Sequence, residues 1–318
     1  FRFKSHLRGA GNTPLPFHLL PGACVVPMCY VFMTSSGKNS AMTLSVFCIL
    51  LFAALLHASW NAIVKAGNDK LYSAISVSGT AAIMALICLP FAPQPSAASL
   101  PFLAVSTALQ VVYTVLVAKT YQVSDMSQTY PLMRGTAPLL VAIISVLFLG
   151  DSLSLLAWVG IATICLAILG MAFNGRSGSQ RGIILALINA CFIAGYTLVD
   201  GTGVRLSETA LGYTLWTFFL NGSCLLGWAM FARRREASRY LVQQWKKGIL
   251  GGIGTMGSYG LALWAMTQAP LAVVAALRET SILFGALLAW LLLKEKVAGI
   301  RLIAAGGIAA GAVLLRLS

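Results

Sequence analysis

The sequence predicts an all-α integral membrane protein with ten transmembrane helices, arranged as two inverted five-helix repeats. Three observations support this fold class. The first is composition, because 58% of the 318 residues are hydrophobic and only 9% are charged, whereas about 25% of a typical soluble domain is charged. The second is a series of apolar runs that are each long enough to cross a bilayer. The third is an internal repeat that aligns Arg134 with Arg278.

The apolar runs define the predicted spans. About 20 residues of helix cross a hydrocarbon core of about 30 Å, and runs of this length recur with short connections between them. Helices are favoured because lipid forces backbone groups to pair within their segment, and the alternating strands of a membrane barrel, about ten residues each, are absent. The ten predicted spans are 43–65, 71–91, 100–119, 129–149, 153–173, 182–201, 210–231, 248–268, 271–293 and 298–316.

Residues 1–41 precede the first span and do not fit this pattern. They contain four basic residues and no acidic residue, and three prolines interrupt their apolar stretch. Basic residues before an apolar stretch suit a secretory signal. We favour the alternative, a disordered or spurious N-terminal extension, with Met42 as the natural start.

The net charge of +14 does not indicate nucleic-acid binding, because the basic residues are spread over the connections between spans. Only residues 233–247 form a basic cluster. Basic connections beside membrane helices mark the cytoplasmic side and contact anionic lipid, so we expect the lipid bilayer, and no nucleic acid, as a partner. Seven cysteines without a CxxC pair indicate small buried residues rather than disulfides or metal ligands.

The internal repeat is clearest at two short motifs. "MRGT" (133–136) aligns with "LRET" (277–280), so that Arg134 meets Arg278 and the two threonines coincide. If the fourth and ninth spans begin near 128 and 270, each arginine lies roughly 9–12 Å deep at 1.5 Å per residue. Because the two spans enter from opposite faces, both arginines approach the membrane centre.

The repeat divides the chain into two halves of five spans, 42–175 and 181–317. An odd number of spans forces the second half to enter the membrane from the opposite side. The halves are then related by a pseudo-two-fold axis in the membrane plane, which is the inverted-repeat plan of secondary transporters. In such proteins the substrate site lies near the midplane at the repeat interface.

The two arginines are the main candidates for this site. A charge at the bilayer centre costs about 2.5–3.5 kcal/mol on insertion scales, so it faces a cavity or a partner. A guanidinium presents a planar fork suited to carboxylate or phosphate, which favours an anionic substrate. The alternatives are snorkelling and a structural ion-pair network, in which Glu279 could reach Arg134 across the interface. Because Glu279 replaces the Gly135 of the first copy, we favour Arg134 as the anion site and Arg278 as the member of a protein ion pair.

Further polar and aromatic residues inside the spans complete the predicted substrate-binding set: His57, Trp60, Asn61, Tyr113, Tyr196 and Tyr259, together with Glu279. His57 and Asn61 are four residues apart and share a helix face. There His57 would titrate as a proton-coupling group; a histidine packed against a carbonyl is the alternative. By contrast, Lys65 and Asp200 fall at predicted helix ends, where charged side chains snorkel to the interface.

Two glycine-rich stretches, 248–260 and 307–311, predict close packing between helices. No GxxxxGK[ST] segment occurs, so ATP-driven transport by this chain alone is not indicated. HExxH, GxSxG and paired carboxylates on one helix face are also absent from the sequence. We therefore predict no enzyme activity, no catalytic residue, no metal and no cofactor.

Two segments resemble a known family. "HASWNAIVKAG" (57–67) and "YPLMRGTAPLLVAIISVLFLGD" (130–151), within ten spans in two halves, look like the drug/metabolite transporter (DMT) superfamily of EamA type. The family's Gly–Glu step after the fourth and ninth spans is Gly150–Asp151 and Lys294–Glu295 here. The resemblance implies a basket of helices around a central cavity, with the fifth and tenth spans at the periphery, and both termini in the cytoplasm. It does not identify a substrate.

These observations predict a secondary active transporter in the cytoplasmic (inner) membrane of a bacterium, as a monomer or homodimer. It would move a small polar or anionic metabolite by alternating access at a midplane cavity, in exchange or with a proton. A lipid-carrier flippase component or an integral-membrane enzyme is the alternative. The positive-inside rule puts the termini outside, opposite to the orientation that the resemblance implies, so the orientation stays open.

Overall fold

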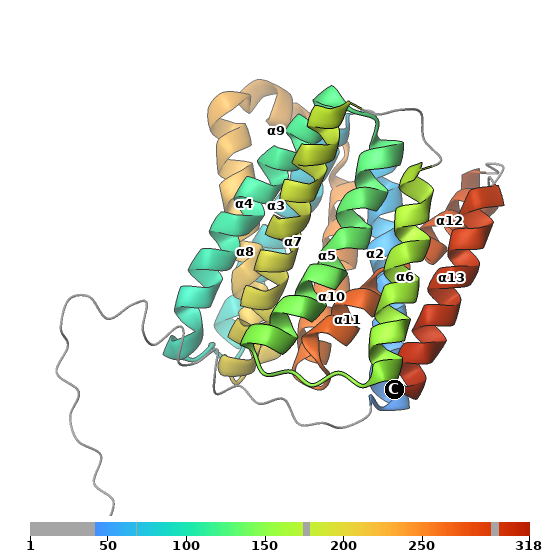
Figure 1. Ribbon diagram of the computed structural model, residues 1–318. Coiled ribbons are helices and arrows are strands. Elements are labelled where there is room, and N and C mark those ends of the chain that lie inside the picture. Colours follow the sequence, from blue (N-terminus) through green and yellow to red (C-terminus); the bar gives the residue numbers. More distant parts are fainter. Residues whose placement is uncertain (1–41, 68, 174–178, 294–298) are drawn as a thin grey trace, which may run out of the picture.

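The computed structural model describes residues 42–67, 69–173, 179–293 and 299–318. The regular elements in these ranges are helices (Figure 1), and the described residues contain ten segments long and apolar enough to cross a membrane, as the sequence predicts. The helices are α2 (Leu44–Lys65), α3 (Lys70–Cys88), α4 (Leu100–Val123), α5 (Met126–Phe148), α6 (Leu155–Phe173), α7 (Gln180–Leu206), α8 (Ala210–Ala232), α9 (Arg234–Gln243), α10 (Trp245–Met266), α11 (Leu271–Arg278), α12 (Ser281–Leu293) and α13 (Gly299–Leu317). The predicted extension 1–41 and the Lys294–Glu295 step lie outside the described residues.

The helices pair in a pattern that is consistent with an inverted repeat. Helix α4 packs along α7, and α10 packs in the same way along α2. Helix α3 packs along α8, and α6 along α13. In an inverted repeat each span of the first half corresponds to the span five positions later. This correspondence converts the pair α4–α7 into the pair α10–α2, and it converts the pairs α3–α8 and α6–α13 into themselves. The pair α6 and α13 stands at one edge of the bundle (Figure 1).

Small residues allow the paired helices to approach closely. A Cβ atom added at Gly311 of α13 would lie 2.8 Å from the carbonyl oxygen of Gly160 in α6. One added at Gly252 of α10 would lie 2.9 Å from the hydroxyl of Thr80 in α3. The predicted packing role of both glycine-rich stretches is therefore confirmed, because backbones this close leave no room for a side chain.

The ninth span is interrupted between α11 and α12. The amides of Glu279 and Thr280 donate to the carbonyls of Ala276 and Leu277, three residues back rather than the four of a regular α-helix. The Thr280 hydroxyl also donates to the Leu277 carbonyl at 2.7 Å, an alternative hydrogen bond of the kind that bends helices. The predicted continuous span 271–293 is thus two helical segments, with Arg278 and Glu279 at their junction.

Two further elements differ from the predicted spans. Helix α7 continues to Leu206, past Gly201 and Gly203, which resemble a helix end in the sequence. Both glycines are instead packing positions, since a Cβ at Gly201 would lie 2.5 Å from a methyl group of Leu271. The basic cluster 233–247, predicted as a connection, contains the additional helix α9.

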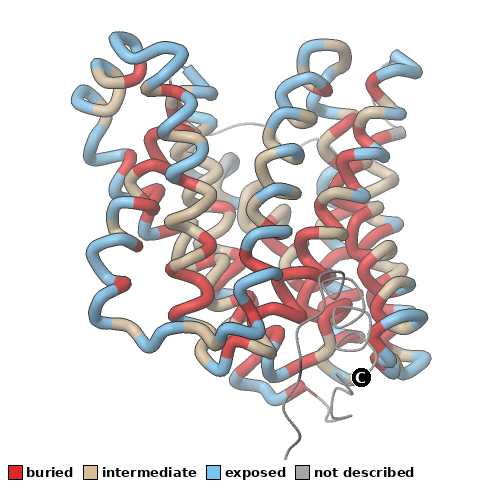
Figure 2. The backbone as a smooth tube through the Cα atoms, turned by 90° about the vertical axis from the view of Figure 1, so that its left-hand side faces the viewer, coloured by how far each residue is buried: buried red, intermediate tan, exposed pale blue. Residues whose placement is uncertain are grey.

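The bundle is densely packed at the end that holds the C-terminus. The start of α2 and the C-terminus lie at this end (Figure 1), and Figure 2 shows buried residues concentrated in this half of the bundle. Residues 196–204 of α7 and 271–277 of α11 are all buried. The protein is therefore closed on this side, opposite to α9.

Candidate functional site

An ion pair joins α5 to the break in the ninth span. Arg134 is 9% exposed and Glu279 is 5% exposed, and Arg134 Nε lies 2.8 Å from Glu279 Oε2. The contact does not have hydrogen-bond geometry, and the buried Nη2 of Arg134 has no hydrogen-bond partner among the described residues. Pro138 also lacks the amide that would bond the Arg134 carbonyl four residues earlier. Arg134 is thus neutralised in charge but retains unused donor capacity.

Arg278 has a different environment. Its guanidinium carbon lies 4.9 Å from the centre of the Tyr259 ring in α10, a cation–π distance, and no ion pair of Arg278 occurs within the described residues. The prediction that Arg278, rather than Arg134, belongs to a protein ion pair is therefore wrong. Adjacent helical residues point about 100° apart, so Glu279 is directed away from Arg278 and reaches Arg134, as the alternative interpretation had it.

Asp200 of α7 forms a second buried polar centre. It is 0% exposed, and neutral groups donate to its carboxylate, among them Tyr213 at 3.0 Å, Tyr259 at 2.5 Å and Gln110 at 3.1 Å. The prediction that Asp200 snorkels from a helix end is wrong, because α7 continues beyond it to Leu206. Tyr213 was not predicted as a site residue, since nothing in its local sequence distinguishes it from a packing aromatic.

Tyr259 connects the two centres. Its hydroxyl donates to Asp200 while its ring face meets the guanidinium of Arg278. Tyr113 and Tyr196 contact each other edge to face, with ring centres 5.6 Å apart, and both are electrostatic neighbours of Arg134. The structure therefore brings six of the predicted residues into one region: Arg134, Arg278, Glu279, Tyr113, Tyr196 and Tyr259.

The three predicted residues of α2 lie beside this region. Arg134 and Arg278 are electrostatic neighbours of His57, and the rings of His57 and Trp60 meet at right angles with centres 5.3 Å apart. The Asn61 amide donates to the His57 carbonyl at 2.8 Å. One donor of Asn61 is therefore used within its own helix, and its position on the His57 face is as predicted.

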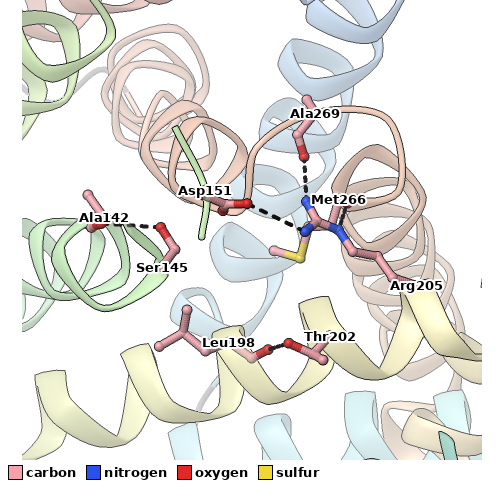
Figure 3. Close-up of polar contacts among 8 residues, drawn as sticks. All are labelled: Ala142, Ser145, Asp151, Leu198, Thr202, Arg205, Met266 and Ala269. Carbon is pink, nitrogen blue, oxygen red and sulfur yellow. Dashed lines mark hydrogen bonds and ion pairs between the residues drawn. The ribbon is translucent and has the colours of Figure 1, made fainter. Parts of the chain in front are cut away.

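A third polar cluster fastens the closed end of the bundle (Figure 3). Arg205, at the end of α7, donates from Nε to the Met266 carbonyl at 2.8 Å and from Nη2 to the Ala269 carbonyl at 3.0 Å. Its Nη1 lies 3.8 Å from Oδ1 of Asp151, which is 5% exposed. Burial raises the pKa of the Asp151 carboxyl, and the Arg205 charge opposes this shift. Arg205 thus ties α7, the end of α10 and the α5–α6 connection together.

Comparison with known proteins identifies the second half of the chain. The sequence model of the "EamA-like transporter family" matches residues 180–317. These residues are therefore similar to the EamA-like transporter family. A solved structure described as "Crystal structure of protein" has 15% sequence identity and a TM-score of 0.63, covering 85% of this chain and 96% of that chain, and so shares the fold. No curated protein matches.

The EamA-like match supports the resemblance to the DMT superfamily, a superfamily of membrane transporters. The ten apolar helices among the described residues make this chain an integral, multi-pass membrane protein. Within the part of the chain that the structure describes, no group of three or more His, Cys, Asp or Glu side chains is placed to hold a metal ion. The structure instead places charged and phenolic groups at the interface of α5, α7, α10 and α11.

Proposed function

We propose that this protein is a secondary active transporter of a small anionic metabolite, which binds between the two halves at Arg134 and Arg278. One observation carries the proposal: Arg134 is buried and its Nη2 has no hydrogen-bond partner among the described residues. A buried donor without a partner costs about 1–3 kcal/mol. A carboxylate or phosphate oxygen would satisfy this donor, and guanidinium groups bind both in a bidentate manner.

The position of the arginines supports alternating access. Arg134 is eight residues from the start of α5 and Arg278 is seven from the start of α11, which places them about 12 Å and 10 Å from opposite ends of the bundle. Both are then near the midplane, where inverted-repeat transporters bind substrate. We propose that the halves 42–175 and 181–317 rock about this site in a bacterial inner membrane, as a monomer or homodimer.

In our proposal, the contacts of Arg205 keep one end of the bundle closed during the transport cycle. The contact of Arg205 with Asp151 joins the two halves, whereas its bonds to Met266 and Ala269 lie within the second half, so opening this end requires that the Asp151 contact break. The substrate exchanges with another solute or moves with a proton. Substrate-binding roles for His57, Trp60, Asn61, Tyr113, Tyr196, Tyr259 and Glu279 are part of the same proposal.

Transport in proteoliposomes tests the proposal. Purified protein is reconstituted, and uptake of radiolabelled L-glutamate, glycerol 3-phosphate, methylphosphonate and, as a neutral comparison, glycerol is measured. We expect uptake of an anion but not of glycerol. Arg134→Gln and Arg278→Gln should each reduce uptake about tenfold or more, since a hydrogen bond to a charged group contributes about 1.5–3 kcal/mol.

The matched control is Arg181→Gln, because Arg181 is an exposed arginine at the start of α7, and its uptake should equal that of the wild type. Arg134→Gln leaves a buried carboxylate at Glu279 without its partner and can therefore destabilise the protein. The double variant Arg134→Gln/Glu279→Gln also lacks the Arg134 guanidinium but leaves no unpaired charge, so it shows whether uptake is lost in a protein that still folds. Wild-type rates and unchanged solute preference in both arginine variants would show that no anion binds there.

A further inference from the structure

Asp200 is a buried carboxylate with unusual surroundings. The side chains that donate to it are neutral: Ser106 and Gln110 from α4, Tyr213 from α8 and Tyr259 from α10. No ion pair of Asp200 occurs within the described residues. The cation among its electrostatic neighbours is Arg278 of α11, whose guanidinium meets the face of the Tyr259 ring, and Tyr196 is a further titratable neighbour.

The charges of the site balance in pairs. Glu279 neutralises Arg134 by direct contact, which leaves Arg278 and Asp200 as the remaining opposite charges, the first at the ring face of Tyr259 and the second at its hydroxyl. An isolated charge in a low-dielectric interior is costly, so a net charge at this centre is disfavoured. When an anion binds at the arginines, one negative charge becomes excess unless a carboxylate is protonated.

We infer that Asp200 binds the proton that accompanies the anionic substrate. This inference rests on the proposed function, because a proton can be coupled only to a solute that the protein moves. On protonation, a proton from water forms a bond to one Asp200 oxygen and the carboxylate loses its negative charge. The new O–H then donates to a tyrosine hydroxyl, which can accept as well as donate, so the hydrogen bonds of the centre are retained in reversed direction.

Coupling follows from linkage. If the anion binds more strongly when Asp200 is protonated, the proton must bind more strongly by the same factor when the anion is present. Arg278 takes part in both events, because it faces the anion site and, through Tyr259, the carboxylate. A proton gradient would then drive accumulation of the anion.

Infrared spectroscopy tests the proton site without any substrate. pH-difference spectra of the reconstituted wild type should contain the C=O stretch of a protonated carboxyl group that is missing from Asp200→Asn. Asp125→Asn is the matched control, because Asp125 is exposed at the start of α5, and it should keep that band. Tyr259→Phe should shift the frequency of the band, since the hydrogen bond to the carboxyl is lost. Spectra of Asp200→Asn identical to those of the wild type would overturn the inference.

Transport measurements distinguish proton coupling from substrate binding. With glycerol 3-phosphate as the probe, Asp200→Asn should exchange internal for external solute within about twofold of the wild-type rate and show no response to an imposed pH gradient. The wild type should accumulate solute at least tenfold more when the outside is acidic. Exchange without a pH response in the wild type would overturn the inference but leave the proposed function intact. Absence of transport of every probe would overturn the proposed function and the coupling with it, whereas the infrared band would still decide whether Asp200 binds a proton.

Discussion

Arg134 of α5 and Glu279 at the break of the ninth span are joined by a 2.8 Å contact between Nε and Oε2. Both side chains are buried, and each comes from a different predicted repeat. The contact therefore links the two halves at the point where the internal sequence repeat is strongest. Because the pair is desolvated, its two members are expected to depend on each other strongly.

A double-mutant cycle tests this dependence. Removing one partner of a buried pair typically costs about 3–5 kcal/mol, because the other charge is left uncompensated. We expect Arg134→Gln and Glu279→Gln each to lower the free energy of unfolding by an amount of this size, and the double variant to lose less than the sum. Reversible unfolding in mixed micelles measures all four proteins. Strictly additive losses would show that the two residues do not interact.

The sequence predicted the charges of the site but not their pairing. Arg134, Arg278 and Glu279 stand out because charged residues are rare in apolar spans. Which of the two arginines contacts Glu279 depends on the direction of side chains at the α11–α12 junction, and this junction arises from i→i−3 hydrogen bonds that no proline or glycine marks. A single-residue change in helix phase rotates a side chain by about 100°, so the pairing could not be derived from spacing alone.

Asp200 illustrates a second limit of the sequence. The segment around it, "VDGTG", resembles a helix end because glycines follow the acid. In the fold, these glycines allow close approach of Leu271 and Phe102, and the helix continues. A glycine can end a helix or allow another segment to pack closely against it. At Gly201 and Gly203 only the neighbouring side chains in the fold distinguish these two roles. Of the tyrosine partners of Asp200, Tyr259 was predicted as a site residue but not as a partner of this carboxylate, and Tyr213 of the next span carries no sequence signal.

Close packing of α3 on α8 gives a prediction about stability. A Cβ atom at Gly222 would overlap the Ser78 carbonyl oxygen and lie 2.6 Å from the Ala82 Cβ. We expect Gly222→Ala to lower the free energy of unfolding by about 1–3 kcal/mol, as other overpacked interiors do. Gly227 lies on the same helix with nothing within 4 Å, so Gly227→Ala should be neutral or slightly stabilising. Equal effects of both variants would contradict the packing argument.

The Asp151–Arg205 contact gives a prediction about pH. Burial raises the pKa of the Asp151 carboxyl in the folded protein, so the folded state favours its neutral form. The stabilisation is fully present below the ordinary pKa of about 3.9 and is lost as pH rises through the folded pKa. Asp151→Asn keeps a neutral side chain at every pH. As the pH rises from the ordinary pKa to the folded pKa, the melting temperature of Asp151→Asn should therefore fall less than that of the wild type.

The control for this experiment is Asp125→Asn, which makes the same substitution at an exposed aspartate, so that the effect of burying the carboxyl is separated from the effect of the substitution itself. The comparison is made by thermal unfolding in detergent from about pH 3.5 upward, starting just below the ordinary pKa of an aspartate. Parallel profiles of the wild type and Asp151→Asn would show that this carboxyl does not change its protonation between the unfolded and folded states.

The distribution of basic residues predicts the orientation of the bundle. Helix α9 and its flanks carry Arg233, Arg234, Arg235, Arg239, Lys246 and Lys247 at the end opposite to the C-terminus. Basic connections are retained in the cytoplasm, and these side chains are exposed and so able to contact anionic lipid. At the other end the side chain of Arg205 is bound to carbonyl groups of the protein. The charge distribution therefore favours a cytoplasmic α9.

Reporter fusions decide between this orientation and the one that the family resemblance implies. We expect alkaline phosphatase fused at Ser318 to be active and a green fluorescent reporter at the same position to be dark, because the C-terminus would lie outside. Fusions after Gln243, in the α9 region, should give the opposite result. A fluorescent fusion at Ser318 would place the termini in the cytoplasm, and the Arg205 contacts would then close the cytoplasmic rather than the external side of the site.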